Sequence, residues 1–372
     1  MRFVPLAILG FLLAAFTSVA SFTEASADFQ IITIAEDLDQ PWGLAFLPDD
    51  KMLVTEKSGQ LRLISEGRLD PRPIEGLPEI YDHGQGGLLD VILHPNYSRN
   101  KLIYLSYVGG RPGNTGTEVL RGRLNLVEYR LEEAEVIFKM QPKLNSSHHF
   151  GSRLLFDDKG YLFVTLGERG EMEESQSLQT HQGTVVRLNA DGSVPDDNPF
   201  VGQANALPEI YSYGHRNAQG IAIHPVTRQI WIHEHGPRGG DEINILKSGA
   251  NYGWPVITYG IDYDGSVIST KTHQDGMEQP VLNWNPSIAP CGMMFYTGDK
   301  FPSWKGNLFV GALVRRHLRR IEFDDEGAVA GQELLLEDRH ERIRNVRQGP
   351  DGLIYILTDS RNGSVLVLKP DK

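Results

Sequence analysis

Short apolar segments recur in pairs along the chain, and each pair flanks a turn rich in Asp, Gly or Asn. One pair is too small to bury both of its own faces, so the units must pack against one another. Successive pairs begin 44 to 72 residues apart, close to or above the about 40–50 residues of a four-stranded propeller blade. The pattern predicts an all-β fold, a six-bladed β-propeller of four-stranded antiparallel blades. The six pairs begin at Gly43 (GLAFLPDDKMLVTEK), Gly87, Ser152, Gly220, Gly292 and Arg344.

The segment Phe29–Ile34 (FQIITI) precedes the first pair and has the composition of a strand. We expect it to join the last blade, because an open ring would leave two strand edges unpaired. A closed propeller gathers loops from every blade around one central opening, so residues far apart in the sequence can form one site.

The first 27 residues have the pattern of a secretory signal peptide. Arg2 is followed by the apolar run VPLAILGFLLAAFTSVA and then by an A-x-A cleavage site at residues 25–27. The alternative is an uncleaved membrane anchor, for which the 17 residues of Val4–Ala20 are short, since a bilayer span takes about 20. We therefore expect a signal peptide at residues 1–27 and a single catalytic propeller domain at residues 28–372.

Cysteine content and charge narrow the compartment and the partners. Cys291 is the only cysteine, so no intrachain disulfide can form, and export without disulfides fits a bacterial periplasm. We expect no stable membrane insertion after signal cleavage. The net charge of −12 repels nucleic acid and anionic membranes. An anionic ligand must therefore meet a local cationic pocket.

Two histidines in LNSSHHFGSR, His148 and His149, stand directly before the inner strand of the third pair. A neutral imidazole in that position is a candidate general base near pH 7. The alternative is a histidine that only bonds nearby backbone groups. The other candidates around the same predicted opening favour the general base.

Arginines supply the candidate anion-binding groups. In GHRNAQG, Arg216 offers a planar guanidinium for a carboxylate and Asn217 a neutral donor and acceptor. In ERIRNVR, Arg342 and Arg344 lie two apart and share one face of a strand. The alternative is salt bridging of this pair to neighbouring acids such as Glu341 and Asp338. Together, these three arginines from two separate repeats would suit a ligand that carries several carboxylates.

The segment HEHGPRGGDEIN, residues 233–244, is the sharpest local pattern. His233 and His235 alternate on a strand, but a zinc site is disfavoured because no third ligand follows at the usual spacing. The Gly-Pro turn exposes carbonyl oxygens, and Asp241 and Glu242 add carboxylates, a donor set that suits calcium.

In its motifs, the chain resembles the soluble quinoprotein aldose dehydrogenases of the glucose/sorbosone type. These are six-bladed propellers that depend on calcium and pyrroloquinoline quinone (PQQ). The resemblance runs from about Pro41 to Leu368. Its most specific motifs are GHRNAQG (214–220), HEHGPRGGDEIN (233–244), NYGWP (251–255) and RIRNVRQGPDG (342–352).

The resemblance implies a role for each candidate residue. His149 falls on the catalytic base, and Arg216 would stabilise developing negative charge. The backbone carbonyls of Gly236 and Pro237 would bind the catalytic calcium, whereas Glu242 and the carbonyl of Tyr252 would bind a second, structural calcium. Cofactor contacts fall on Gln85, Arg216, Asn217, Ser287, Arg342 and Arg344. One departure is Val314, which stands where the family usually has a cofactor-contacting lysine and is followed by Arg315 and Arg316.

The implied activity is a periplasmic oxidoreductase that oxidises the C1 hydroxyl of an aldose sugar to a lactone. His149 would take the hydroxyl proton while the C1 hydride passes to calcium-bound PQQ, and an external acceptor would then receive the electrons. Two alternatives stay open, namely a calcium-dependent propeller hydrolase of the sugar-lactonase type and a non-enzymatic binding propeller. Neither of them needs the arginine cluster. The sequence names neither the sugar nor the electron acceptor.

Overall fold

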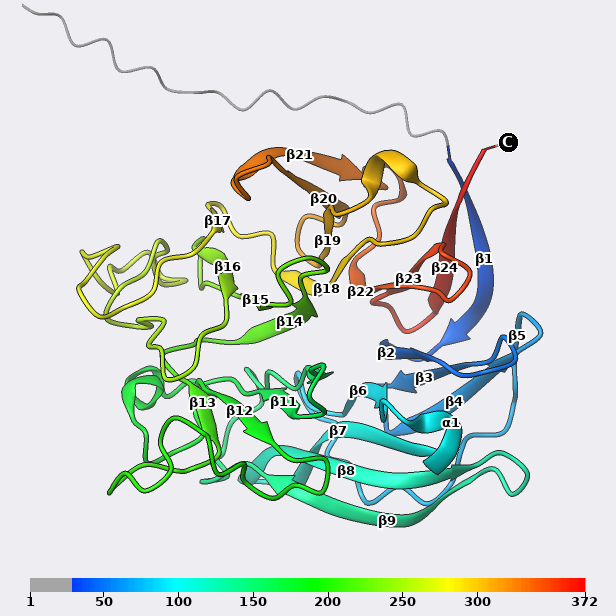
Figure 1. The fold of residues 1–372 in the computed structure, drawn as a ribbon, viewed down its shortest axis with the longest axis horizontal. Helices are drawn as coiled ribbons and strands as arrows, with labels where there is room; N and C mark the ends of the chain where they lie inside the picture. The colour runs from blue at the N-terminus through cyan, green and yellow to red at the C-terminus, as the bar shows by residue number, and fades with distance from the viewer. Residues whose placement is uncertain (1–28, 372) are drawn as a thin grey trace, which may run out of the picture.

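A computed structural model describes residues 29–371 and arranges their strands as six four-stranded antiparallel sheets around a ring (Figure 1). This confirms the predicted six-bladed propeller. Each of the six apolar pairs supplies the first two strands of one blade, as in β2 and β3 of blade 1. The proposed signal peptide lies outside the described residues.

The first three blades follow the chain in order. Blade 1 consists of β2 (Pro41–Phe46), β3 (Met52–Glu56), β4 (Gln60–Ser65) and β5 (Arg68–Leu69). Blade 2 consists of β6 (Leu88–Leu93), β7 (Leu102–Arg111), β8 (Asn114–Asn125) and β9 (Arg130–Lys139), with the short helix α1 (Tyr97–Asn100) after β6. Blade 3 consists of β10 (Leu154–Phe156), β11 (Leu162–Thr165), β12 (Val185–Leu188) and β13 (Ile210–Ser212).

The remaining blades complete the ring. Blade 4 consists of β14 (Ala218–Ile223), β15 (Ile230–Glu234), β16 (Asp241–Ile245) and β17 (Leu282–Trp284). Blade 5 consists of β18 (Pro290–Phe295), β19 (Leu308–Ala312), β20 (Leu318–Phe323) and β21 (Val329–Leu335). Blade 6 consists of β22 (Ile343–Gln348), β23 (Ile354–Thr358), β24 (Gly363–Pro370) and β1 (Phe29–Leu38). Short 3₁₀ helices cover Met172–Gln176, Pro302–Trp304 and Glu337–Arg339.

The ring is closed by its two ends, as expected from the strand-like composition of Phe29–Ile34. Strand β1 pairs antiparallel with β24, from Phe29 opposite Pro370 to Leu38 opposite Gly363 (Figure 1). The closure also packs blade 6 against blade 1, because Leu38 of β1 shares an apolar cluster with Val54 of β3. Hydrogen bonding of the N-terminal strand into the last blade removes two edges that would otherwise be unpaired.

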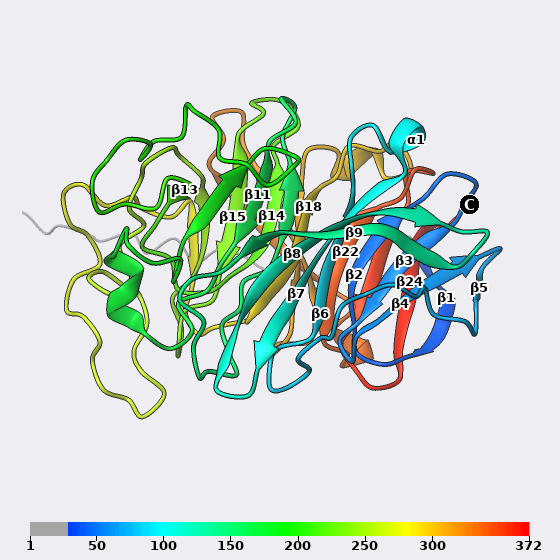
Figure 2. The same cartoon turned by 90° about the horizontal axis from the view of Figure 1, so that it is seen from below.

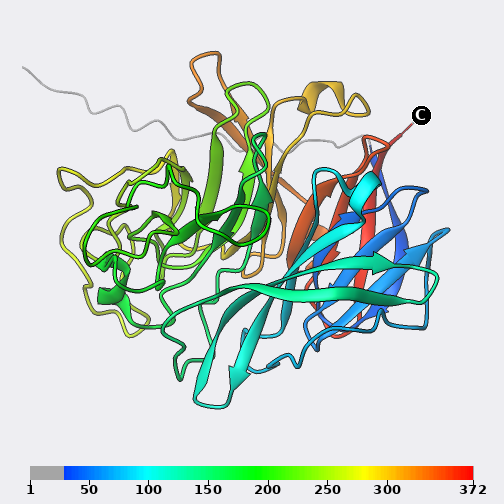
Figure 3. The same cartoon turned by 60° about the horizontal axis from the view of Figure 1, so that its bottom comes forward.

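The innermost strands β2, β6, β10, β14, β18 and β22 contact one another around the axis. Each is the first strand of its blade in chain order (for blade 6, the first after the closing β1), so all six run in the same direction along the axis. We call the end where they begin the N-terminal opening and the end where they finish the C-terminal opening. The hairpin between β7 and β8 and the long loop between β16 and β17 extend on the same side of the ring (Figure 2), and Figure 3 shows the long strands of blade 2 in front.

Within residues 29–371, no helix has the length and the apolar character needed to cross a membrane.

The contact between the closing strand and blade 1 yields a stability prediction. Leu38 has no exposed surface, so Leu38→Ala removes buried apolar contacts and leaves a cavity, which should cost about 2–5 kcal/mol of unfolding free energy. Urea denaturation followed by circular dichroism measures the loss. The matched control is Val127→Ala, at a position 88% exposed, which should change stability by less than about 0.5 kcal/mol. Equal stability of the two variants would contradict closure by β1.

Candidate active site

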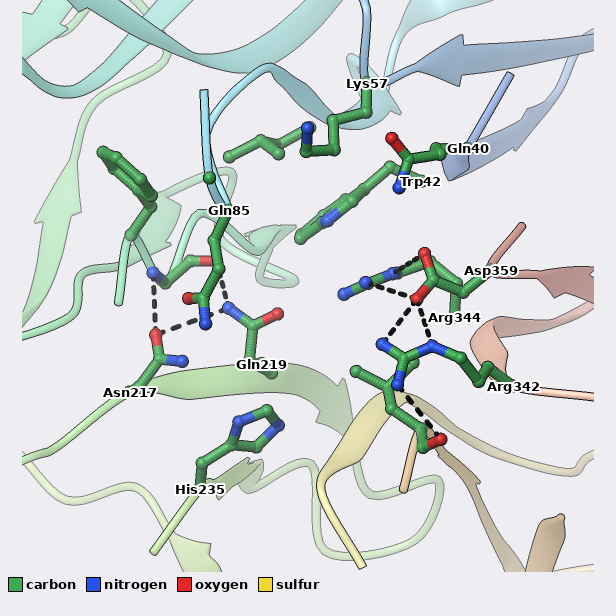
Figure 4. Close-up of a pocket in the computed structure, with 15 residues that line it drawn as sticks. Gln40, Trp42, Lys57, Gln85, Asn217, Gln219, His235, Arg342, Arg344 and Asp359 are labelled. Carbon is green, nitrogen blue, oxygen red and sulfur yellow. Dashed lines mark hydrogen bonds and ion pairs between the residues drawn. The ribbon is translucent and has the colours of Figure 1, made fainter. Parts of the chain in front are cut away.

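A polar cavity of about 200 Å³ lies at the N-terminal opening (Figure 4). Its walls come from the beginnings of several innermost strands, because these strands start together on this side of the ring. Trp42 comes from β2, Gln219 from β14 and Arg344 from β22. Figure 4 shows Arg342, Arg344 and Asp359 on one side of the cavity and Gln85, Asn217 and Gln219 on the other.

Arg342 and Arg344 share one counterion, Asp359. The Nη2 atoms of Arg342 and Arg344 lie 2.7 and 3.0 Å from Asp359 Oδ2. Burial raises the pKa of this carboxyl, but the two guanidinium groups outweigh burial and hold the pKa below its usual value. The sequence suggested Glu341 and Asp338 as neighbouring partners, yet the carboxylate that binds both arginines comes from the loop after β23, where only the fold could place it.

Charge accumulates on the ring axis beneath the cavity. Asp90 of β6 lies 3.4 Å from Arg153 and 3.6 Å from Arg347. The axial cluster, as we call it, thus joins four guanidinium groups to two carboxylates and carries surplus positive charge. Its members are Asp90, Arg153, Arg342, Arg344, Arg347 and Asp359. The chain as a whole has a net charge of −12, so this centre is cationic against the overall charge of the protein.

His149 is fixed from two directions. Its backbone N–H donates to Gln85 Oε1 at 2.8 Å, and its Nδ1 lies 2.6 Å from Glu168 Oε2. The backbone of Gly167 passes so close that a Cβ there would lie 2.0 Å from the His149 carbonyl oxygen. Burial lowers the pKa of His149 below 6.5 even though Glu168 opposes the shift. The ring is therefore neutral at pH 7, and a carboxylate next to Nδ1 favours the tautomer with its lone pair on Nε2.

A second cavity, of about 420 Å³, adjoins the first through Gln85, which lines both. His149, His148 and Arg216 face this space. Two aromatic side chains, Trp254 and Tyr263, also line it, and Tyr263 is 67% exposed. The second cavity is thus the more open part of the site, whereas the first, with Lys57, Arg342 and Arg344 in its lining, is the more cationic.

Arg216 joins its own segment, GHRNAQG, to the segment that carries Glu234 and Gly236. Its backbone N–H donates to Glu234 Oε2 at 2.6 Å, and its Nη1 donates to the carbonyl oxygen of Gly236 at 3.0 Å. The guanidinium carbon lies 5.3 Å from the centre of the Trp254 ring, within cation–π range. Pro237, the next residue along the turn, lines the second cavity.

Asp241 ties the Gly236 turn to the loop before β18, a role that the sequence did not reveal. It accepts hydrogen bonds from the backbone N–H groups of Gly236 at 2.9 Å and Ile288 at 2.7 Å. Ser287 donates its hydroxyl to Asp241 Oδ2 at 2.7 Å. It is not among the residues that line the two cavities. Its contact with a cofactor, which the resemblance implies, stays a prediction.

Two carboxylates, Glu234 and Glu242, stand opposite each other on β15 and β16. Asn244 Nδ2 donates to Glu242 Oε2 at 3.1 Å, and lies 3.3 Å from Glu234 Oε1. Burial, reinforced by the charge of Glu234, raises the pKa of Glu242. Like charges directly opposite on neighbouring strands are unfavourable unless a cation joins them. Tyr252 is buried, and its ring stacks on His215 at 4.4 Å.

Metal-binding side chains are otherwise sparse. Residues 29–371 contain no group of three or more His, Cys, Asp or Glu side chains placed to hold a metal ion. His233 and His235 instead lie within hydrogen-bond distance of the carbonyl oxygens of Gly292 and Pro290, at 3.1 and 2.7 Å.

Most of the predicted residues come together, and some of their partners were missed. The cavities collect Gln85, His149, Arg216, Asn217, Pro237, Arg342 and Arg344. Sequence reasoning overlooked Glu168 and Asp359, each an acid in a segment without a recognisable motif. It named Asp241 as a carboxylate for calcium, but not as the group that holds the Gly236 turn. It also overlooked Lys57, a cation that lines the first cavity. Val314, which stands where the family usually has a lysine, is 60% exposed.

Comparison with known proteins agrees with the motifs. Residues 38–367 match the family described as Glucose / Sorbosone dehydrogenase. Aldose sugar dehydrogenase YliI of Escherichia coli K12 is 45% identical over 350 residues, covering 93% of this chain and 94% of the relative. A crystal structure of the soluble aldose sugar dehydrogenase from E. coli in the apo-form has a TM-score of 0.89 at 44% identity, covering 92% and 99% of the two chains. The PQQ-bound aldose sugar dehydrogenase of Streptomyces coelicolor has a TM-score of 0.76 at 25% identity, covering 92% and 99%.

The shared counterion yields a prediction for the ligand-free protein. Asp359→Asn leaves two neighbouring guanidinium groups without their carboxylate, so it should lower the unfolding free energy by roughly 1–3 kcal/mol. Urea denaturation at low salt measures this loss. The control Asp325→Asn removes the same charge from an exposed turn and should have little effect. An Asp359→Asn protein as stable as the parent would show that the arginines do not depend on this carboxylate.

Proposed function

Because this chain belongs to the glucose/sorbosone dehydrogenase family of oxidoreductases, we propose that it oxidises the C1 hydroxyl of aldose sugars to lactones with PQQ and calcium. The observation that supports this most strongly is the position of the His149–Glu168 pair at the edge of a cationic cavity. A buried base beside an anion-binding pocket suits proton removal from a substrate next to an anionic cofactor.

The residues of the first cavity fit a polycarboxylate such as PQQ. Arg342 and Arg344 present guanidinium groups, and Asn217 and Gln85 present amides on the opposite side (Figure 4). The surplus positive charge of the axial cluster favours an anion that a neutral pocket would exclude. We propose Lys57 as an additional cation in place of the lysine that Val314 replaces. Ser287 would act indirectly, by holding Asp241 and with it the Gly236 turn.

His149 is the proposed general base. Glu168 holds the proton of the ring on Nδ1, so Nε2 is free to accept the proton of the C1 hydroxyl. The imidazolium formed in this step would be stabilised by the adjoining carboxylate. Arg216, whose backbone is anchored by Glu234, places a positive charge near the reacting atoms and would stabilise negative charge that develops there.

The second cavity is the proposed sugar site. It adjoins the first cavity and contains the two histidines and the exposed ring of Tyr263. Aromatic rings pack well against the apolar faces of a sugar. When bound, PQQ would supply the hydride acceptor, and calcium would supply a Lewis acid beside it.

Two groups of oxygen atoms are proposed to hold calcium. The carbonyl oxygens of Gly236 and Pro237 lie in a turn that Asp241 fixes, and carbonyl oxygen is a ligand that calcium prefers. Glu242 would bind a second calcium together with the carbonyl oxygen of Tyr252. The opposed carboxylates of Glu234 and Glu242 support this assignment, because a cation relieves their repulsion.

We further propose that residues 1–27 are removed on export and that residues 28–372 act as one catalytic domain in the periplasm. Electrons would then pass to an external acceptor. The alternatives, a propeller hydrolase and a non-enzymatic binding propeller, leave the arginines without a role, so reconstitution with PQQ separates them from the dehydrogenase.

Reconstitution of the purified chain with PQQ and calcium should give dye-linked oxidation of glucose, and His149→Ala should reduce the turnover by about 10²–10⁴-fold. His148→Ala is the matched control and should keep most of the turnover. Fluorescence titration should show that both variants bind PQQ normally. Because burial lowers the pKa of His149, kcat/KM of the parent should decline only below pH 6.5. Full turnover of His149→Ala would overturn the assignment of the base, and no oxidation at any PQQ concentration would overturn the proposed function.

The second calcium site makes Glu242→Gln informative. Without calcium, the variant should be about as stable as the parent, because burial and Glu234 raise the pKa of Glu242 to about 8 and the neutral acid and Gln have similar shapes. With calcium at about 100 times its Kd, the parent should gain about 2.7 kcal/mol, and the variant much less. Thermal melts in chelator and in calcium measure both effects, with Glu326→Gln as an exposed control. The same calcium response in all three proteins would refute this site.

A further inference from the structure

The C-terminal opening of the ring holds a third cavity, of about 350 Å³, unlike the two described above. Its walls are the ends of the innermost strands, and they are apolar. The wall residues include Phe46, Leu93, Leu154, Phe156 and Ile221. The single charged residue among those that line it is Arg347.

Arg347 is only weakly engaged by the protein. Its Nη1 lies 3.4 Å from the carbonyl oxygen of Met293, and its Nη2 lies 3.6 Å from Asp90 Oδ1, both long for hydrogen bonds. Asp90 is also committed elsewhere, since it accepts from the backbone N–H of Leu154 at 3.1 Å and pairs with Arg153. The side chain of Arg347 keeps 20% of its surface exposed.

The cavity is separate from the candidate active site. Arg344 lines the first cavity and Arg347 lines the third, and three residues of β22 span about 10 Å along the strand. Between the two openings, Arg153 and Asp90 fill the axis and are almost fully buried. A ligand in the third cavity would therefore not contact the sugar or the cofactor.

We propose that the C-terminal opening binds an aliphatic monocarboxylate. The carboxylate would pair with Arg347, and the chain would lie along the apolar ends of β2, β6 and β10. One guanidinium with donors to spare matches one carboxylate, and a charge-assisted pair in an apolar surrounding is stronger than one in water. The apolar walls favour a hydrocarbon chain, and the volume falls in the range of small-molecule sites. An inorganic anion would leave these walls uncovered.

Isothermal titration of the purified chain with octanoate, hexanoate, butanoate and acetate tests the proposal. Affinity should rise with chain length, by at most roughly fourfold for each buried methylene. Octylammonium carries an equally long chain with the opposite charge and should not bind. Equal affinity across the acid series, or binding of octylammonium as tightly as octanoate, would overturn the proposal.

Variants locate the site. Arg347→Gln should weaken octanoate binding by about tenfold or more, whereas Arg361→Gln, which removes an exposed arginine, should not. Leu93→Asp keeps Arg347 but adds a negative charge to the wall, so it should also abolish octanoate binding. This variant tests the site if Arg347→Gln fails to fold. Saturation with PQQ should leave octanoate binding unchanged. The site would be refuted if PQQ displaced octanoate, or if octanoate bound the Arg347→Gln and Leu93→Asp proteins as tightly as it binds the parent.

Discussion

One buried guanidinium group, that of Arg153, holds the centre of the ring together. It stands just before β10 of blade 3 and contacts the innermost strand of each of the other five blades. Its Nε donates to the Gln219 carbonyl at 2.9 Å, its Nη2 donates to the Arg344 carbonyl at 3.0 Å, and it stacks on Trp42 at 3.8 Å. Asp90 supplies its counterion, and Cys291 lies 3.4 Å away. A charge so deeply buried is tolerated only when its donors are satisfied, so all six innermost strands must keep their positions.

The common direction of the innermost strands gives the two openings opposite characters. Their beginnings carry polar side chains and meet long loops, such as the one between β16 and β17, so the N-terminal opening collects bases, amides and arginines. Their ends carry apolar side chains and short turns, so the C-terminal opening is apolar except for Arg347. The axial cluster separates the two openings and contributes Arg342 and Arg344 to the first and Arg347 to the second.

The cationic centre also explains how an acidic protein can select an anion. Surface charges act at long range and are screened by salt, whereas most of the axial charges are buried and therefore act strongly over a few ångströms. Asp359 offsets part of this charge in the ligand-free protein. It pairs with both Arg342 and Arg344 and thereby keeps them in place.

The sequence by itself determined the architecture: the six apolar pairs, the closing strand and the motifs around His149, Arg216 and Arg344. Strand periodicity and turn chemistry are local properties, so they can be read along the chain. Only the tertiary structure decided the partners. Glu168 contacts the ring of His149, Asp359 pairs with Arg342 and Arg344, and Asp241 accepts a hydrogen bond from Ser287. These contacts join segments that no spacing rule relates, because the ring brings together side chains from blades far apart in the sequence. The ionisation of each side chain then depends on which charged groups are buried beside it.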